Sequence, residues 1–313
     1  MKLINKGIHH ITAIAGDPQE NADFYTGVLG LRMVKKTVNF DDPETYHLYF
    51  GDYQGTPGTV ITFFPRPNGE KGVLGGGQVG VSTYAVPKGA LLFWEERLAK
   101  FHINFTLETR FEEKYISFQD PHGLQIEITE RAAGAPSRHS IGTLTEKTAI
   151  KGFQGATLYS TAPDKTGDLL ENLFGFEKIG EDRGLIRYKS PQDLGDVLDL
   201  KKTAPAPGTT GVGTVHHIAF RASNDQEQLA WKKLLEDQGY RVTEVRDRNY
   251  FKSIYFNEEG GILFEIATEG PGFDVDEPLE KLGERFMLPE EYQPVREKLE
   301  KKLPKIVVRE LEK

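Results

Sequence analysis

The stretch KYISFQDPHGLQIEI at residues 114–128 aligns without a gap with KSIYFNEEGGILFEI at residues 252–266. In both stretches apolar and polar residues alternate, a turn follows, and the alternation resumes, which predicts two strands joined by a turn. Just upstream, residues 94–103 and 231–240 each begin with Trp and have the apolar spacing of an amphipathic helix. The chain therefore consists of two duplicated halves.

Each half is in turn made of two similar units. The openings of the halves, GIHHIT at residues 7–12 and GFQGAT at residues 152–157, correspond to one another. Units of one strand, one helix and several further strands begin near residues 7, 78, 152 and 213, which gives four βαβββ modules. The predicted fold class is therefore α+β, with two modules in each of two tandem domains. We expect the domains at residues 7–131 and 152–269, a linker at 132–140, and a C-terminal helical tail at 270–313 that packs across the domains.

Alternating helices and strands would also fit a parallel α/β sheet. That fold needs one buried, apolar strand for each helix. Here several short alternating strands follow each helix. Paired βαβββ modules, whose curved sheets enclose a cavity, explain the pattern better.

Composition narrows the possible functions. The net charge of −8, with Lys and Arg interspersed among Asp and Glu, gives no basic face for nucleic acid. The absence of Cys excludes thiolate metal ligands and a cysteine nucleophile. Residues 1–7 lack the apolar segment typical of a signal peptide, and no run of apolar residues is long enough to span a membrane. We expect a cytoplasmic protein that binds no nucleic acid and no membrane, and homo-oligomer formation stays open.

Four of the eight histidines occur in two identical dipeptides. His9-His10 opens the first module and His216-His217 opens the fourth, both on predicted first strands. Successive strand residues face opposite sides, so we expect one His of each pair to point into the cavity and its neighbour away. Glu265 lies on the otherwise apolar closing strand of module four, where a carboxylate is costly to bury unless it is paired or binds a metal. Two imidazoles and one carboxylate suit Fe(II) and leave open coordination positions.

These His-His-Ile strands, the closing Gly-Gly-x-x-Phe-Glu strand and the four-module repeat resemble the vicinal-oxygen-chelate superfamily. Within it, YHLYF at residues 46–50, GTPGTV at 55–60 and TYAVPKG at 83–89 resemble the hydroquinone ring-cleaving dioxygenases. The resemblance covers nearly the whole chain. It implies an Fe(II)-dependent enzyme that opens para-dihydroxylated aromatic rings with O2, and a role in detoxifying quinones and their reduced forms.

The resemblance also implies which residues form the site. The metal ligands of the family fall on His10, His217 and Glu265. Its catalytic polar residues fall on His9, Thr12, His216, Arg248 and Tyr255. Module three has Gln154-Gly155 where a histidine pair would stand, so the resemblance places the site across the two domains.

The catalytic roles that follow are specific. We expect Tyr255 to act as general acid or base. We expect His216 or Arg248 to hold the second oxygen of the substrate or an anionic intermediate.

The remaining acidic and histidine residues considered for the site are interpreted as structural. Glu127, the counterpart of Glu265, is interpreted as a relic or a structural acid because module two offers no histidine. His47 is interpreted as a hydrogen-bonded core residue, although it could line the pocket. Three further histidines fall on a helix end, a turn and the linker, where we expect exposure to solvent: His102, His122 and His139.

Two other functions compete with ring cleavage. A glyoxalase-type isomerase or lyase would use a divalent metal as a Lewis acid and would normally want four protein ligands. A metal-free binding protein would have no need for two histidine pairs and an acid in one register. The sequence does not predict which ring substituents are accepted.

Overall fold

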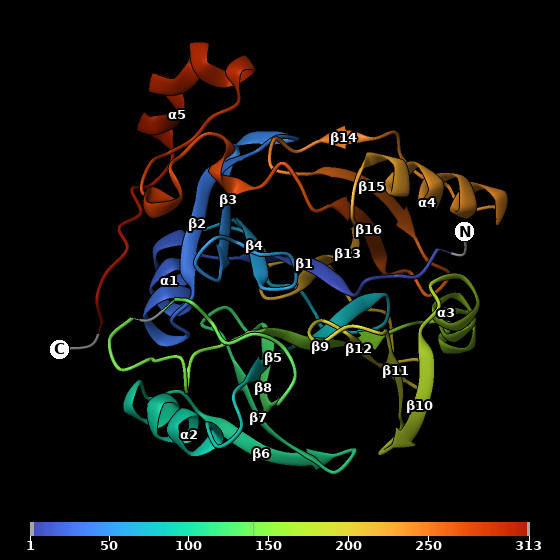
Figure 1. The fold of residues 1–313 in the computed structure, drawn as a ribbon. Coiled ribbons are helices and arrows are strands. Elements are labelled where there is room, and N and C mark those ends of the chain that lie inside the picture. Colours follow the sequence, from blue (N-terminus) through green and yellow to red (C-terminus); the bar gives the residue numbers. More distant parts are fainter. Residues whose placement is uncertain (1–2, 140, 312–313) are drawn as a thin grey trace.

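The computed structural model describes residues 3–139 and 141–311, and these residues form four βαβββ modules (Figure 1). Ser140, at the end of the predicted linker, and the last two residues of the predicted tail lie outside the described residues. Both the α+β fold class and the modular repeat are confirmed. The predicted domain boundaries stay a prediction.

The modules repeat the same order of elements. Module one contains β1 (Ile8–Ala15), α1 (Pro18–Ala22) continued by a π-helical turn (Asp23–Val28), β2 (Arg32–Asn39), β3 (Asp42–Gly51) and β4 (Val60–Pro65). Module two contains β5 (Gln78–Val86), α2 (Leu91–Lys100), β6 (Phe105–Arg110), β7 (Glu113–Gln119) and β8 (Gln125–Glu130). Module three contains β9 (Gly152–Tyr159), α3 (Pro163–Asp168) continued by a π-helical turn (Leu169–Leu173), β10 (Glu177–Asp182), β11 (Leu185–Lys189) and β12 (Val197–Lys201). Module four contains β13 (Val215–Ala222), α4 (Asp225–Asp237), β14 (Arg246–Asp247), β15 (Lys252–Asn257) and β16 (Leu263–Thr268).

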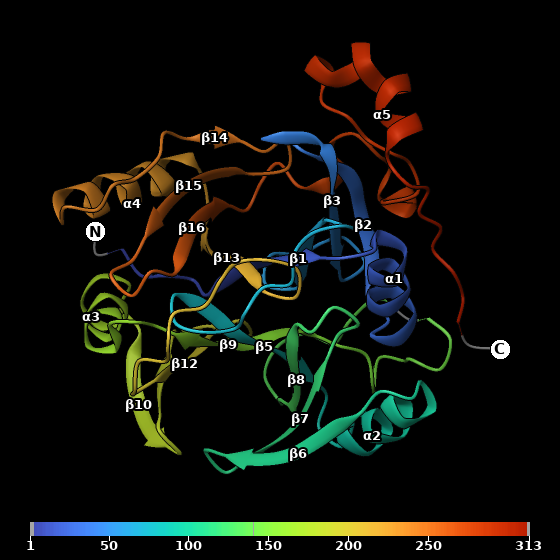
Figure 2. The same cartoon turned by 180° about the vertical axis from the view of Figure 1, so that it is seen from behind.

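Two curved eight-stranded sheets organise the molecule, and each sheet takes one module from each predicted domain. Modules four and one form the order β14-β15-β16-β13-β1-β4-β3-β2, whereas modules three and two form β10-β11-β12-β9-β5-β8-β7-β6. At the centre of the sheets, β1 pairs antiparallel with β13, and β5 with β9. Figures 1 and 2 show the first sheet above the second, with the helices on the outside. Both histidine pairs therefore lie in the same sheet.

Apolar helix faces cover the convex sides of the sheets. Trp94 on α2 and Trp231 on α4, which the sequence aligned, are both fully buried. Trp231 packs edge-on against Phe174, which in turn packs against Phe220 of β13. Burying large aromatic side chains on the convex side stabilises each sheet and leaves its concave side for polar chemistry.

The tail leaves module four and packs on the outer strands of module one (Figure 1). Its one α-helix is α5 (Arg296–Lys302), and the rest of its described part consists of short 3-10 turns and extended chain. The hydroxyl of Tyr46 donates to the carbonyl of Pro304, 3.0 Å away, and the hydroxyl of Tyr292 donates to the carbonyl of Phe40, 2.9 Å away. The backbone N–H of Met287 also donates to the carbonyl of Lys36 on β2, 2.9 Å away, so the tail pairs with part of this edge strand.

The pairing of β1 with β13 contains two irregularities, and they fall on the outer histidines. The register passes over His9 and over His216, so each is the extra residue of a β-bulge. In the other sheet the register passes over Gly80 and Gln154 in the same way. A bulge redirects the side chain of its extra residue. The expected alternation is wrong for His216 and His217, which both line the cavity described below, whereas in the first pair His10 lines it and His9 does not.

Gly155 on β9 stands where module one has His10. A Cβ atom at Gly155 would lie 2.0 Å from the carbonyl oxygen of Val197, so this backbone leaves no room for any side chain. The second sheet therefore cannot supply a histidine at this position.

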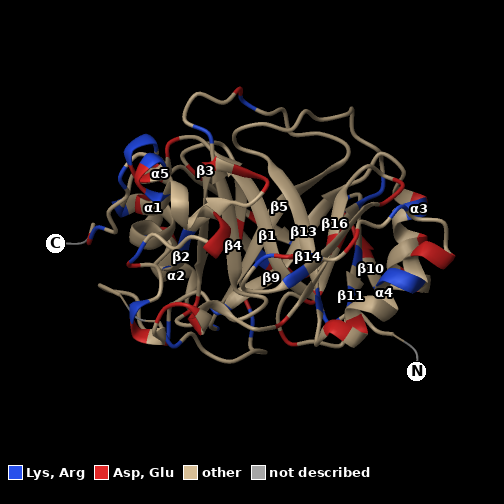
Figure 3. Ribbon diagram, turned by 90° about the horizontal axis from the view of Figure 1, so that it is seen from above, with Lys and Arg blue, Asp and Glu red and all other residues tan. Residues whose placement is uncertain are grey.

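The distribution of charged residues and the character of the helices agree with what the sequence composition predicts. Figure 3 shows Lys and Arg interleaved with Asp and Glu along the ribbon rather than gathered on one face. Among the described residues, no helix is long and apolar enough to cross a membrane.

Candidate metal centre

Strand register brings the three predicted ligands to one point on the concave face. Glu265 on β16 is in register with Ala219 on β13, and Ala219 is in register with His10 on β1. His217 lies two residues before Ala219, so its side chain is on the same face of the sheet. All three side chains are buried. Within the described part of the chain they form the one group of acidic and histidine side chains close enough to hold a metal.

The distances between the ligand atoms suit one small cation. Nε2 of His217 lies 2.8 Å from Oε2 of Glu265 and 3.4 Å from Nε2 of His10, and Nε2 of His10 lies 3.4 Å from Oε2. Three ligands bound at about 2.1 Å and at right angles to one another would be roughly 3 Å apart. The three atoms therefore fit one face of an octahedral metal ion.

The carboxylate of Glu265 uses its two oxygens differently. Oε1 accepts a hydrogen bond from the hydroxyl of Ser253, whereas the buried Oε2 has no aligned hydrogen bond although Nε2 of His217 lies 2.8 Å away. Burial would raise the pKa of Glu265, but His10 and His217 hold that pKa well below its usual range. Burial lowers the pKa of His217. A carboxylate beside a neutral imidazole is the form that binds metal, so the residues fit a divalent cation.

His9 fixes the tautomer of His10. The carbonyl oxygen of Thr268 can only accept, so Nε2 of His9, 3.1 Å away, must carry a hydrogen. Burial holds the pKa of His9 well below its usual value, so His9 is neutral and its Nδ1 accepts. Nδ1–H of His10, 2.9 Å away, is then the donor. This leaves the Nε2 lone pair of His10 free to bind a metal.

The second pair is built in the same way but opens into a cavity. Nδ1 of His216 lies 2.8 Å from Nδ1 of His217. If His217 keeps its Nε2 lone pair for a metal, its Nδ1–H donates to His216, and the hydrogen of His216 is then on Nε2. Desolvation, followed by the neighbouring His217, lowers the pKa of His216 to about 4, so the ring is neutral. His216 lines the cavity and can donate a hydrogen bond to a ligand there.

A cavity of about 290 Å³ lies over these ligands. Three phenylalanine rings, those of Phe40, Phe64 and Phe251, line it. The ring of Phe251 packs 5.0 Å from that of His10. Its polar lining comes from both modules of the first sheet and comprises His10, Asn39, Asp41, His47, Arg66, His216, His217, Thr243, Arg246, Arg248 and Tyr255. Such a cavity suits one substituted aromatic ring.

Tyr255 and Arg248 meet at the cavity wall. Tyr255 on β15 is in register with Glu265, and its ring lies 5.6 Å from that of His217. Nε–H of Arg248 donates to the hydroxyl oxygen of Tyr255 at 3.3 Å. Burial, and then the charge of Glu265, raise the pKa of Tyr255, so its phenol is protonated at neutral pH.

Thr12 lies behind the cavity, in a chain of polar side chains. Its hydroxyl oxygen is 2.8 Å from that of Thr62, and Thr62 in turn is 2.8 Å from Nε2 of His47. The hydroxyl of Tyr49 lies 2.8 Å from Nδ1 of His47. Both interpretations of His47 therefore apply. It is hydrogen-bonded, and it also lines the cavity. Neither Thr12 nor His9 lines the cavity, so both contact the site from behind.

Sequence reasoning missed most residues of the cavity wall, among them Asp41 and Phe251, and it also missed Ser253 beside Glu265. Ser253 could have been found from strand alternation, because it precedes Tyr255 by two residues and must share its face. The expectation that His122 is exposed is wrong. A Cβ atom at Gly16 would lie 2.7 Å from its ring, so the glycine leaves the space in which His122 is buried.

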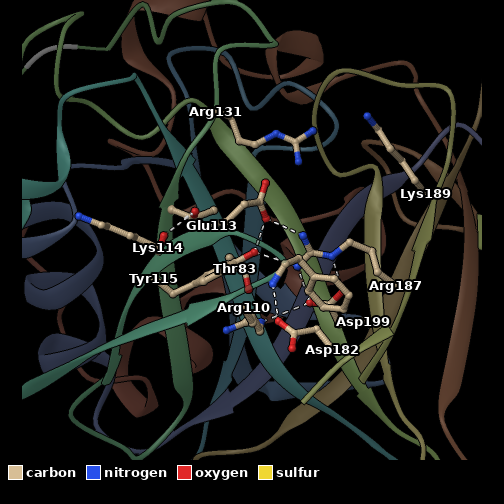
Figure 4. A network of polar contacts seen from close by, with 12 residues as sticks. Thr83, Arg110, Glu113, Lys114, Tyr115, Arg131, Asp182, Arg187, Lys189 and Asp199 are labelled. Atoms are coloured by element: carbon tan, nitrogen blue, oxygen red, sulfur yellow. Dashed lines mark hydrogen bonds and ion pairs between the residues drawn. The ribbon is translucent and has the colours of Figure 1, made fainter. Parts of the chain in front are cut away.

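In the second sheet, charged side chains occupy the corresponding place (Figure 4). Glu127, the counterpart of Glu265, accepts from both Arg110 and Thr83. Arg187 donates to Asp199 at 2.7 Å, and the guanidinium of Arg110 stacks on the ring of Tyr115. Guanidinium groups therefore balance the buried carboxylates of the second sheet.

Comparisons with known proteins identify a family and several relatives of this sequence. The sequence matches the Glyoxalase/Bleomycin resistance protein/Dioxygenase superfamily over residues 7–128 and 152–266. MhqO of Bacillus subtilis strain 168, a candidate ring-cleaving dioxygenase, is 58% identical over 306 residues, which cover 98% of each chain. The chlorohydroquinone/hydroquinone 1,2-dioxygenase of Sphingobium indicum is 34% identical over 304 residues, which cover 94% of each chain.

Two solved structures have a fold similar to that of this chain. A crystal structure of a candidate dioxygenase from Bacillus subtilis matches with a TM-score of 0.98 at 57% identity, covering 99% of this chain and 100% of that one. Glyoxalase I of Zea mays matches with a TM-score of 0.64 at 14% identity, covering 89% and 97%. At that identity the maize enzyme shares the fold alone.

Proposed function

Because the chain belongs to the Glyoxalase/Bleomycin resistance protein/Dioxygenase superfamily, we propose that it is an Fe(II)-dependent dioxygenase that opens hydroquinone-type aromatic rings with O2. Ring-cleaving dioxygenase activity is supported by the full-length relatives of that class. The preference for para-dihydroxylated rings is supported by the Sphingobium indicum relative, whose name specifies chlorohydroquinone and hydroquinone. Removal of such compounds from the cell is the proposed role.

One observation carries the proposal: His10 and His217 line a cavity with aromatic walls and converge there with the buried Glu265. Bound Fe(II) would be held by these three residues and would supply a Lewis-acidic, redox-active centre with open coordination positions. Phe40, Phe64 and Phe251 would exclude water and pack against the ring of the substrate.

The polar groups of the cavity that face a ligand are mainly donors. His216 offers Nε2–H and Tyr255 its hydroxyl, and Arg248 brings a positive charge. Donors and positive charge stabilise an oxygen that gains negative charge during a reaction. Tyr255 can also give up its proton to such an oxygen, because its high pKa keeps it protonated beforehand. These residues therefore suit the second oxygen of a dihydroxylated ring.

A glyoxalase-type isomerase or lyase is the competing function. It would want four protein ligands, and among the described residues the cluster contains three. The three-ligand set therefore favours ring cleavage.

Reconstitution separates the two functions. Metal-free protein is loaded separately with Fe(II), Zn(II) or Ni(II) and given 2-methylhydroquinone under isotopically labelled O2. We expect ring opening with Fe(II) alone, and a product that contains both labelled oxygen atoms. Turnover with Zn(II) or Ni(II) in the absence of O2 would instead establish the isomerase or lyase.

A further inference from the structure

The turn between β2 and β3 reaches across the cavity mouth to module four. Oδ2 of Asp41, in this turn, accepts a hydrogen bond from Nη2 of Arg248 at 2.8 Å. Oδ1 of the same carboxylate accepts from Nη1 of Arg246 at 3.0 Å. Figure 1 shows the β2–β3 turn beside β14 at the top of the molecule. One carboxylate of module one thus holds two arginines of module four.

The two branches of this contact differ in their exposure. The side chain of Arg246 is 47% exposed, whereas that of Arg248 is 15% exposed. Water screens the Arg246 branch, and exposed ion pairs of this kind contribute little. The sheltered Arg248 branch continues inward, because Nε–H of Arg248 donates to the hydroxyl oxygen of Tyr255.

The hydrogen bonds that link Asp41, Arg248 and Tyr255 have a fixed donor–acceptor direction. A guanidinium group has only donors, so the oxygen of Tyr255 must accept from Arg248. The hydrogen of the Tyr255 hydroxyl must then point away from Arg248. Tyr255 lines the cavity and its ring packs against that of His217, so a hydrogen directed away from Arg248 is available to the cavity.

We propose that Asp41 is a positioning residue that, by holding Arg248 against Tyr255, directs the Tyr255 hydroxyl hydrogen into the cavity. The role of the hydrogen rests on the function proposed above, whereas the contact between the three side chains does not. Asp41 is placed on a different module from Arg248 and Tyr255, so the alignment depends on the pairing of modules one and four.

The second sheet offers an internal comparison. There the carboxylate of Asp182, at the end of β10, accepts from the backbone N–H of Phe111 at 2.6 Å, so the two hairpin turns also meet. That contact leads to no tyrosine, and Arg110 and Arg187 pair with Glu127 and Asp199 instead. The second sheet also contains a carboxylate–arginine–tyrosine chain, because Arg187 donates to Asp199 and to the hydroxyl of Tyr115. Its carboxylate lies on β12, whereas in the sheet with the metal centre the carboxylate comes from the turn between β2 and β3.

The first test measures turnover of 2-methylhydroquinone by the Fe(II)-loaded protein. We expect Asp41→Ala to lower kcat about tenfold and to leave KM within about twofold, because a misdirected donor weakens the reacting state more than substrate binding. Asp41→Glu is expected to recover part of the loss. Asp42→Ala is the matched control, because the carboxylate of Asp42 accepts from Thr45 and contacts neither arginine in the described contacts.

A double-mutant comparison tests the route through Tyr255. If Asp41 acts through this hydroxyl, Asp41→Ala has no further effect on kcat in a Tyr255→Phe background. A full tenfold loss in that background would overturn the proposal. So would an equal loss of kcat in Arg246→Ala, since the exposed branch would then be the important one.

A second readout does not depend on activity. The 15N-resolved Nε–H signal of Arg248 is recorded in metal-free protein, where its hydrogen bond to Tyr255 should slow exchange with water. We expect Asp41→Ala to accelerate this exchange and Asp42→Ala to leave it unchanged. If exchange accelerates but no variant or wild type turns over any hydroquinone, the proposed function fails and the positioning contact stands. If exchange is unchanged in Asp41→Ala, the positioning role itself is wrong.

Discussion

Nε2 of His217 lies 2.8 Å from Oε2 of Glu265, on the neighbouring parallel strands β13 and β16. The pKa of Glu265 is held well below its usual range, and burial also lowers the pKa of His217, so this is a neutral imidazole beside a carboxylate. When Nδ1–H of His217 donates to His216, Nε2 presents a lone pair to a negatively charged oxygen. Such a pair in a buried site requires a positive charge between its two atoms, either a bound cation or a hydrogen on Nε2.

Glu265→Gln tests this requirement without an enzymatic assay. The variant keeps the size of the side chain and removes its buried charge. Adding Fe(II) anaerobically should raise the melting temperature of wild type and not that of the variant. An equal rise in both proteins would mean that the metal binds elsewhere.

Ser253→Ala tests how the carboxylate is held. The Ser253 hydroxyl donates to Oε1 of Glu265 and leaves Oε2 directed at the histidines. Loss of a group that orients a metal ligand weakens metal affinity by about 10- to 100-fold. The dissociation constant for Fe(II), measured by competition with a chelator, should rise by this factor. An unchanged constant would show that the strand alone orients Glu265.

Substitution of Lys35 on β2 tests how the tail is attached to module one. Its side chain is fully buried, and its Nζ lies 2.5 Å from Oδ1 of Asp276 and 2.6 Å from Oε2 of the fully buried Glu277. Lys35→Met should cost about 3–5 kcal/mol of unfolding free energy, because it removes the paired charge of a buried carboxylate that then keeps only backbone donors. Urea unfolding measures the loss, and adding Glu277→Gln to the variant should recover part of it. Lys178→Met, which breaks an exposed pair, is the control.

The buried carboxyl group of Glu258 should make the stability of the protein depend on pH. Burial raises the pKa of Glu258 above its ordinary value of 4.5, although Thr166 and the backbone of Ile262 donate to its carboxylate. The folded state therefore holds this proton more tightly than the unfolded state. Its stabilising contribution is complete below pH 4.5 and is lost as pH rises through the raised folded value.

The comparison with Glu258→Gln isolates this group, because Gln does not titrate. As pH falls from 7 towards 4.5, the unfolding free energy of wild type should rise relative to that of the variant. Unfolding in urea at several pH values measures the difference. A difference that is constant, or that changes in the opposite direction, would contradict the raised pKa.

The sequence predicted the modules because strand and helix periods repeat within each of them. The aligned Trp94 and Trp231, for example, mark equivalent buried helices. Pairing of module one with module four depends on contacts between distant strands, on which periodicity has no bearing. Family resemblance was therefore needed to bring His10 to His217. In the tail, Pro278, Pro289 and Pro294 precede α5 and limit it to a short helix, because proline interrupts helical hydrogen bonding.

Within the site, the sequence patterns and the resemblance pointed to the metal-binding residues and to the histidines beside them, and missed Ser253, which holds Glu265. Strand alternation cannot anticipate the bulges at His9 and His216, because a bulge breaks the two-residue period. The contact of Asp41 with Arg248 joins two turns far apart in the chain. An acidic residue in a turn is ordinary in any sequence, so nothing local indicated this contact.

The most direct test of the proposed function is oxygen uptake by anaerobically prepared, Fe(II)-loaded protein given 2-methylhydroquinone, with His10→Ala measured beside wild type. His10 comes from module one and the other two ligands from module four, so this variant tests both the chemistry and the pairing of the modules. We predict one O2 consumed for each ring opened by wild type, and no uptake by His10→Ala. Wild type that binds Fe(II) but consumes no O2 with any dihydroxybenzene, or a His10→Ala variant that remains fully active, would contradict the account.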